Sequence, residues 1–381
     1  MTGMNDTSKE IYEHLYVIGN GFDLYHGAAS SYYDFRKYLL HHNIDIIKTF
    51  DLYFGPRSLK HTIGHLILLE WYFGDFPHIH FPVPENDWAM KWLWSDFERS
   101  LSMLNREKIM DILDTVLPAL NEDDADFSYA DYYAPLDSIS DRINLCSFEM
   151  RYHFHKWIKT LQYAKGHKHK LLYLDRNALF LNFNYTEFLE DVYQIPHNKI
   201  CYIHGSKRDK YGSLVLGHHL EEEEEFEMWI HKNKNRKRNR PNLKDKHGKY
   251  FANDKLCYLA YFSENPEKGN WRNPIRYYAV EDAIERYGDY FKKSYKDTDA
   301  VILKHENFFN SLSSIKEITV IGHSFSDIDR IYFQKIVQSI HNIESVKWHF
   351  SIHTKKDEQN LKRLLLWLNI PLKENVRTFN L

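Results

Sequence analysis

The stretch His14–Asp23, which reads HLYVIGNGFD, decides the fold of this chain. Its first five residues are mostly β-prone or apolar and predict a short buried strand over His14–Ile18. A turn with glycines at Gly19 and Gly21 follows, and then a carboxylate at Asp23. Such a turn after a parallel strand is typical of nucleotide-binding α/β sheets, because the first glycine permits a tight turn and the second lets a phosphate approach the backbone.

Further apolar runs alternate with helical patterns along the chain. Strands are predicted over Ala178–Phe183, Lys199–Ile203, Ser213–Leu216, Glu317–Ile321 and Val346–His353, and helices over 186–193, 277–312, 329–340 and 357–368. Strands and helices in alternation predict a parallel sheet with helices on its faces. The carboxyl ends of the strands then meet at one edge, where open α/β sheets bind nucleotides.

The predicted sheet is assembled from distant parts of the chain. We expect residues 11–40 to form the first part of a nucleotide-binding core, 171–220 to continue it and 316–381 to complete it. Residues 41–170 are predicted to be a mainly helical insertion, because apolar residues recur there at helical spacing. Residues 221–315 are expected to hold a charged loop and a second helical insertion. The expected fold is therefore an α/β Rossmann-type parallel sheet with a large, mainly helical insertion.

Charge limits the classes of partner. The net charge of −3 over 381 residues gives no global case for nucleic acid. A local exception is residues 232–249, with nine Lys or Arg against the single acid Asp245, after five glutamates at 221–225. We interpret this segment as a solvated surface, with a lid or a partner- or RNA-binding loop as the alternatives.

Membrane, disulfide and metal sites are not expected. No run approaches 18 apolar residues and the first ten residues are polar, which favours a cytoplasmic protein without a membrane span. The three cysteines are far apart, so a disulfide framework and a zinc ribbon are disfavoured. Three histidine pairs have no carboxylate or cysteine at ligand spacing; they are His78/His80, His153/His155 and His218/His219. No metal is therefore predicted.

Amide and imidazole groups at two strand ends are candidates for chemistry. Asn182 and Asn184 alternate and present both amides to one side, where an amide can orient a water or a ribose hydroxyl. The alternative is turn chemistry, with Asn184 bonding its own backbone. His204 ends the next strand and can act as a general base or bond a ribose. Thr186 is predicted to be the N-cap of the helix over 186–193.

The first and last turns supply the remaining candidates. Asp23 is suited either to accept ribose hydroxyl bonds or to cap a helix. Ser324 follows Gly322 and can bond a phosphate or a ribose. Asp327 and Asp329 are interpreted first as caps of the next helix and second as ribose contacts.

Together these motifs resemble the AbiH-type phage abortive-infection family. The block Leu15–Ser31 resembles its N-terminal signature, and Phe183–Thr186, Ile203–Gly205 and Ile321–Asp329 resemble its other blocks in order. That family is in turn distantly similar to sirtuins and to sirtuin-like defence NADases. The resemblance implies a sirtuin-like sheet, an antiphage effector and NAD⁺ as the substrate.

The resemblance also implies roles for particular residues. Asn184 and His204 become the catalytic pair of an NAD⁺ glycohydrolase, in which Asn184 positions water and His204 activates the water or the ribose hydroxyl. The products would be nicotinamide and ADP-ribose. The expected nucleotide contacts are Gly19, Asn20, Gly21, Asp23, Gly27, Gly322, Ser324 and Asp327.

Three other functions stay open. The chain could be a sensor that binds NAD⁺ or an ADP-ribose derivative without turnover, or a nucleic-acid-acting toxin that uses the basic loop 232–249. It could also be a structural adaptor on a degenerate nucleotide fold. A toxic activity would need control, and the helical insertion, the segment 221–249, a regulatory protein partner or a homo-oligomer could supply it.

Overall fold

The computed structural model describes most of the chain in two compact units. The described residues are 11–54, 93–105, 128–164, 171–220, 224, 227–228, 230–232, 247, 249, 274–370 and 375–381. Unit 1 comprises 1–35, 154–216 and 297–381, and unit 2 comprises 36–153 and 217–296. The histidines His78 and His80 and most of the basic segment 232–249 lie outside the described residues. The division into core and insertions expected from the sequence stays a prediction.

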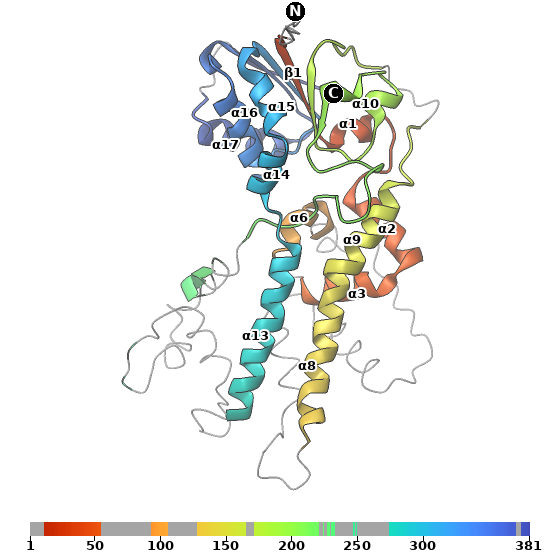
Figure 1. The fold of residues 1–381 in the computed structure, drawn as a ribbon, viewed down its shortest axis with the longest axis vertical. Coiled ribbons are helices and arrows are strands. Elements are labelled where there is room, and N and C mark those ends of the chain that lie inside the picture. Colours follow the sequence, from red (N-terminus) through yellow and green to blue (C-terminus); the bar gives the residue numbers. More distant parts are fainter. Residues whose placement is uncertain are drawn as a thin grey trace, which may run out of the picture. The chain divides into compact units, whose positions relative to one another are not determined.

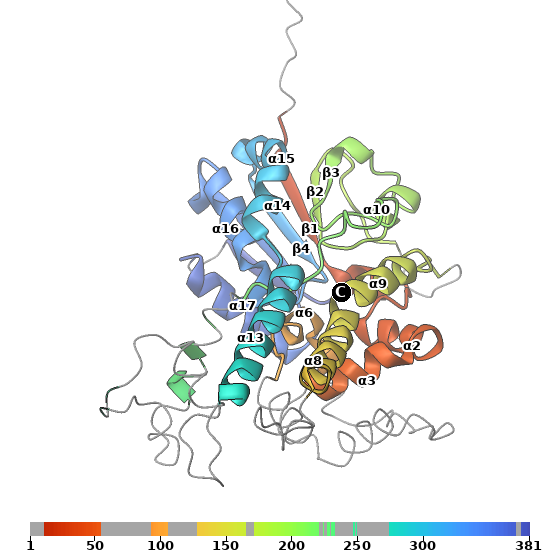
Figure 2. The ribbon, with the colours of Figure 1, turned by 60° about the horizontal axis from the view of Figure 1, so that its bottom comes forward.

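Unit 1 is built on a six-stranded, all-parallel sheet in the order β3-β2-β1-β4-β5-β6. Figure 2 labels the strands β1 to β4 of this sheet. The strands are β1 (His14–Ile18), β2 (Leu179–Asn182), β3 (Ile200–Tyr202), β4 (Glu317–Ile321), β5 (Lys347–Ser351) and β6 (Val376–Phe379). This confirms the predicted parallel α/β sheet, and its sirtuin-like character stays a prediction. The order matches that of doubly wound nucleotide-binding sheets, with the topological switch point between β1 and β4.

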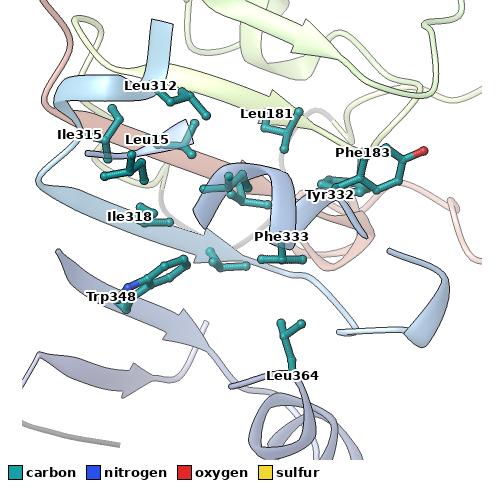
Figure 3. Packing of buried hydrophobic residues seen from close by; sticks show 14 of the residues in the cluster. Leu15, Leu181, Phe183, Leu312, Ile315, Ile318, Tyr332, Phe333, Trp348 and Leu364 are labelled. Atoms are coloured by element: carbon teal, nitrogen blue, oxygen red, sulfur yellow. The ribbon is translucent and has the colours of Figure 1, made fainter. Parts of the chain in front are cut away.

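Alternate residues of β1 face two separate hydrophobic clusters. Leu15 and Val17 belong to one cluster, which also holds residues of α15 (Glu306–Asn310), α16 (Arg330–Ser339) and α17 (Lys355–Trp367). Figure 3 shows Leu15 in this cluster with Tyr332 and Phe333 of α16. Tyr16 and Ile18 belong to the other cluster, which holds residues of α1 (Asn20–Tyr25) and α10 (Phe188–Asp191).

Both faces of the central strands are therefore covered. Figure 1 shows α15 and α16 on one side of the sheet and α1 and α10 on the other. Each fully buried Leu, Val, Ile or Phe contributes about 1.5–3 kcal/mol relative to exposure, so the two clusters hold the strand ends firmly in place. α17 begins with a capping box, in which Thr354 Oγ1 accepts from Asp357 N and Asp357 Oδ2 accepts from Thr354 N.

Unit 2 is helical in its described residues. Its helices are α3 (Ile44–Tyr53), α6 (Phe97–Ser100), α8 (Tyr129–Asn144), a π-helical turn (Leu145–Glu149) and α13 (Pro274–Ser294). The unit boundaries fall within α2 (Tyr32–His42) and α9 (Met150–Ile158), and α14 (Thr298–Lys304) belongs to unit 1. Arg36 and Asp51 form a buried ion pair at 3.0 Å, and Trp94 Nε1 donates to the second Asp51 oxygen at 3.1 Å. Buried charges need such pairing.

Two predicted elements are wrong. Ser213–Leu216 is not a strand; it runs as a loop, from which Val215 N donates to His204 O at 2.9 Å. The predicted helix over 186–193 is only the short α10, and the residue at its N-cap position is Glu187 rather than Thr186. Among the described helices, none is both long and apolar enough to cross a lipid bilayer.

Candidate functional site

The turns after β1 and β4 touch each other through their glycines. Gly19 N donates to Ile321 O at 2.9 Å, and Gly21 N donates to Gly322 O at 2.7 Å. A Cβ on Gly21 would lie 2.6 Å from Gly322 Cα, and a Cβ on Gly322 would lie 2.2 Å from Phe22 N. Gly322 also has a φ of +66°, which disfavours every residue with a Cβ. The close approach of these two backbones therefore requires glycine.

Because of this contact, the backbone amides of the glycines already donate hydrogen bonds within the chain. The amides of Gly19 and Gly21 are donated to the neighbouring turn, and Gly322 N is donated to Ser351 Oγ at 2.7 Å. The space expected for a phosphate at Gly21 is occupied by the backbone of Gly322. Gly27 has a φ of +75° and its N donates to Leu24 O, so it ends α1. Phosphate binding at these four glycines stays a prediction, and other groups would have to supply the hydrogen-bond donors for the phosphate.

Asn20 and Ser324 are the exposed residues of the same two turns. Asn20 Nδ2 donates to Ser30 O at 3.0 Å, and Ser30 Oγ donates to Asn20 Oδ1 at 2.6 Å. Ser324 lies after β4, and its carbonyl accepts from Asn360 Nδ2 at 2.9 Å. The structure thus places both predicted contacts at the switch point of the sheet.

A buried polar network joins the turns after β1 and β2. Asn184 Nδ2 donates to Asp23 Oδ1 at 2.7 Å and to Gly19 O at 3.1 Å. Thr186 Oγ1 donates to Asp23 Oδ2 at 2.7 Å, and Asn184 N donates to Asn182 Oδ1 at 3.0 Å. Asp23 is only 2% exposed and Asn184 only 5%. Sequence reasoning found both residues but missed that they bond each other, and it missed the hydroxyl of Thr186 as the third member.

Burial raises the pKa of Asp23 to about 7, although the bonds from Thr186 and Asn184 and the charge of Lys207 favour the carboxylate. At neutral pH this carboxyl group is therefore divided between its two protonation states. A carboxyl group with such a perturbed pKa at the carboxyl end of a strand is a candidate for acid–base chemistry.

The Asp23 carboxyl group should make stability depend on pH. Its pKa is about 7 in the folded protein against an ordinary 3.8, so the folded state binds more protons between these values. The free energy of unfolding should therefore fall as pH rises from about 4 to 7. Asp23→Asn should remove up to about 1.4 kcal/mol per pH unit of this slope. Urea unfolding across this pH range measures it, with the exposed Asp299→Asn as the control, and parallel slopes for Asp23→Asn and wild type would contradict the assignment.

Two histidines pack around the ring of Phe183. His204 and His323 both lie edge-on to Phe183, with ring centroids 5.3 Å and 4.8 Å away. His204 also contacts the ring of Tyr332 at 5.7 Å, and Figure 3 shows Phe183 beside Tyr332. Sequence reasoning gave His204 and missed its aromatic surroundings.

Asn184 and His204 lie at the same level of the sheet. Asn182 pairs with Tyr202 in the ladder of β2 and β3, and Ile203 N donates to Asn182 O at 3.1 Å. Asn184 and His204 each follow two residues later, so both lie just beyond the ends of two adjacent strands. Their immediate partners differ, because the Asn184 amide bonds Asp23 whereas the His204 ring packs against aromatic side chains.

The residues after β4 hold His323 in one tautomer. Phe325 N donates to His323 Nδ1 at 2.9 Å, so the proton lies on Nε2, which faces Asp329 Oδ2 at 3.5 Å. Asp329 occupies the N-cap position of α16 as predicted, but its carboxylate makes no cap bond. Asp327 is exposed and forms an ion pair with Arg330. Its predicted ribose contact stays a prediction.

An ion-pair network that the sequence did not reveal follows β2 and β3. Arg208 Nη1 lies 2.9 Å from Glu190 Oε2, and Lys207 Nζ lies 3.4 Å from Glu187 Oε2. Arg208 also approaches Asp191 at 3.5 Å. The network fastens the loop after His204 to α10. In the described part of the chain, no group of three or more His, Cys, Asp or Glu side chains is placed to hold a metal ion.

Comparison with known families identifies the chain. Residues 15–352 match the family model described as bacteriophage abortive infection AbiH. The match runs from β1 to β5 and includes every candidate site residue named above. No curated protein and no solved structure matches the chain. Since the match covers most of the sequence, the chain belongs to the AbiH family of bacteriophage abortive-infection proteins.

Proposed function

We propose that this protein is an abortive-infection effector that hydrolyses NAD⁺ to nicotinamide and ADP-ribose at the carboxyl edge of its sheet. Membership of the AbiH family supports the role in abortive infection. The observation that carries the proposed chemistry is the convergence of Asp23, Asn184 and Thr186 from the ends of two adjacent strands. Cleavage of a glycosidic bond develops positive charge on the sugar, and a correctly oriented amide oxygen, such as that of Asn184, stabilises such charge.

The strand order supports a dinucleotide that lies across the ends of the strands. Doubly wound sheets bind ligands outside the carboxyl ends of their strands at the switch point, which here lies between β1 and β4. The amides of the glycine turns are already donated within the chain. We therefore place the pyrophosphate beside the exposed residues Asn20 and Ser324.

The proposed reaction needs one positioned water and one base. Water attacks the ribose carbon, the carbon–nitrogen bond breaks, and its electron pair neutralises the cationic nicotinamide ring, so the leaving group needs no general acid. Both amide protons of Asn184 are donated to Asp23 and Gly19. Its Oδ1 is therefore the atom that accepts a hydrogen bond from the water. His204 takes the proton that the water loses.

Product analysis tests this proposal. Purified protein is incubated with NAD⁺, and nicotinamide and ADP-ribose are separated by chromatography and quantified beside a heat-denatured sample. We expect the two products in equal amounts. Intact NAD⁺, in a sample that also fails to bind NAD⁺ by calorimetry, would refute the proposal. Nicotinamide without ADP-ribose would instead point to transfer of the ADP-ribosyl group to another acceptor.

One observation favours a second function, a nucleotide sensor. The Asn184 amide and the Asp23 carboxyl group bond each other within the protein, so these hydrogen bonds form without a substrate. A sensor would bind NAD⁺ or ADP-ribose tightly and release no nicotinamide. In that case Asn184→Ala would change the affinity measured by calorimetry and nothing else.

A further inference from the structure

The partners of the Asn184 side chain fix which way its amide faces. Nδ2 donates to Gly19 O at 3.1 Å and to Asp23 Oδ1 at 2.7 Å. A backbone carbonyl can only accept a hydrogen bond, and the same is true of an ionised carboxylate. If the amide were flipped, Asn184 Oδ1 would face Gly19 O and Asp23 Oδ1. Three hydrogen-bond acceptors would then lie together in a buried place with no donor between them. The network therefore allows one orientation of the amide.

The Asp23 carboxyl group is itself held in place by the segment 182–186, which also carries Asn184. Thr186 Oγ1 donates to Asp23 Oδ2 at 2.7 Å, Asn182 Nδ2 donates to Thr186 O at 3.4 Å, and Asn182 Oδ1 accepts from Asn184 N at 3.0 Å. These contacts close a ring that starts and ends at Asp23. Neither Asp23 nor Asn184 can rotate without breaking a bond inside a nearly solvent-free environment, which costs about 1–3 kcal/mol for each unsatisfied group.

We propose that Asp23 is a positioning residue, which orients the Asn184 amide so that Oδ1 receives the attacking water or a ribose hydroxyl. The inference rests on the proposed hydrolysis of NAD⁺ and adds to it a residue that acts through Asn184. It replaces the ribose contact expected for Asp23 from the sequence. The water then finds an oriented acceptor before it reacts, and such pre-organised geometry accounts for large parts of enzymatic rates.

This role does not depend on the charge of Asp23. The groups that face its carboxyl group are Asn184 and Thr186 from the segment after β2 and, through its charge, Lys207 from the loop after β3. A protonated carboxyl group can donate to Thr186 Oγ1 and still accept from Asn184 Nδ2. Asparagine has the same shape and the same pattern of donor and acceptor, so it can replace the acid in this role.

Kinetics of two variants separate positioning from proton transfer. Asp23→Ala should lower kcat for NAD⁺ about 100-fold with a much smaller change in KM, because the amide is free to turn. Asp23→Asn should restore kcat to within about tenfold of wild type, because it keeps both bonds. A folded Asp23→Asn variant as inactive as Asp23→Ala would overturn positioning and assign a proton transfer to the acid. Wild-type kcat in Asp23→Ala would also overturn it.

A second measurement does not depend on NAD⁺ turnover. In protein labelled with ¹⁵N-asparagine, the side-chain NH₂ signals of Asn184 are assigned by their loss in Asn184→Ala, and their exchange with D₂O is followed. Slow exchange in wild type and Asp23→Asn, and fast exchange in Asp23→Ala, support the proposal. Fast exchange in wild type overturns it. If Asp23→Ala does not fold, the kcat of Asp23→Asn alone decides between positioning and proton transfer. If wild type does not hydrolyse NAD⁺, the proposed function fails, and the exchange data still test the orientation of the amide.

Discussion

Replacing Gly322 with alanine should destabilise the protein by about 3–5 kcal/mol, enough to unfold a marginally stable domain. The new Cβ would lie 2.2 Å from Phe22 N and 2.5 Å from Gly21 C. These are backbone atoms, which cannot rotate away, so the turns after β1 and β4 would have to separate and release the bond from Gly21 N to Gly322 O. The φ of +66° adds about 1–2 kcal/mol of strain.

Gly212→Ala is the matched control for this substitution. Gly212 has a φ of +93°, but a Cβ there would meet no atom within 4 Å. It should therefore show the backbone strain alone, about 1 kcal/mol. Urea unfolding followed by circular dichroism measures both variants. Equal losses would show that the contact between the two turns does not require glycine for packing.

Replacing His204 with alanine should lower the rate of NAD⁺ hydrolysis about 10²- to 10⁴-fold, the usual effect of removing a general base. The effect should appear in kcat, because the base acts on the water and not on substrate binding. Initial rates of nicotinamide release measure it. The loss should be larger than that for Asp23→Ala, since His204 would take the proton whereas Asp23 only orients the amide.

Two histidine variants test whether the loss reflects chemistry or packing. His323 lies edge-on to the same Phe183 ring and is as buried as His204, so His323→Ala disturbs the same aromatic cluster. His349 lies on β5 beside Glu317. The second variant, His349→Ala, therefore shows the effect of removing a histidine of the sheet outside this aromatic cluster. If His323→Ala lowered kcat as much as His204→Ala, at equal stability, the aromatic cluster and not a base would explain both results.

The sequence was sufficient to predict strands whose residues face two packed layers. The bounds of β1 and β4 are those expected, because apolar residues in these runs point to both clusters and glycine follows each run. β6 was missed, since Val376–Phe379 is short and half-exposed and has no apolar pattern of its own. Family membership was also predicted from the motifs and is confirmed, whereas the sirtuin-like relationship stays a prediction.

The bonding within the candidate site could not be predicted. Thr186 has the sequence position of an N-cap, but its hydroxyl bonds Asp23, a partner 163 residues away. Gly21 has the position of a phosphate-binding glycine, but its amide bonds Gly322 across the switch point. Local propensity determines neither choice, because each depends on a segment that only the folded sheet brings close.

The pairing of β1 has a consequence for the nascent chain on the ribosome. This strand is synthesised first, yet Leu15 pairs with Leu179 and His14 pairs with Glu317. At roughly 5–20 residues per second, β1 is complete tens of seconds before β4 exists. β2 can pair with one edge of β1 earlier, but the edge toward β4 stays unpaired during all of that time, which exposes it to aggregation and makes chaperone capture useful. A growing polypeptide therefore cannot form the contact between the turns after β1 and β4 until residues 317–322 have been synthesised.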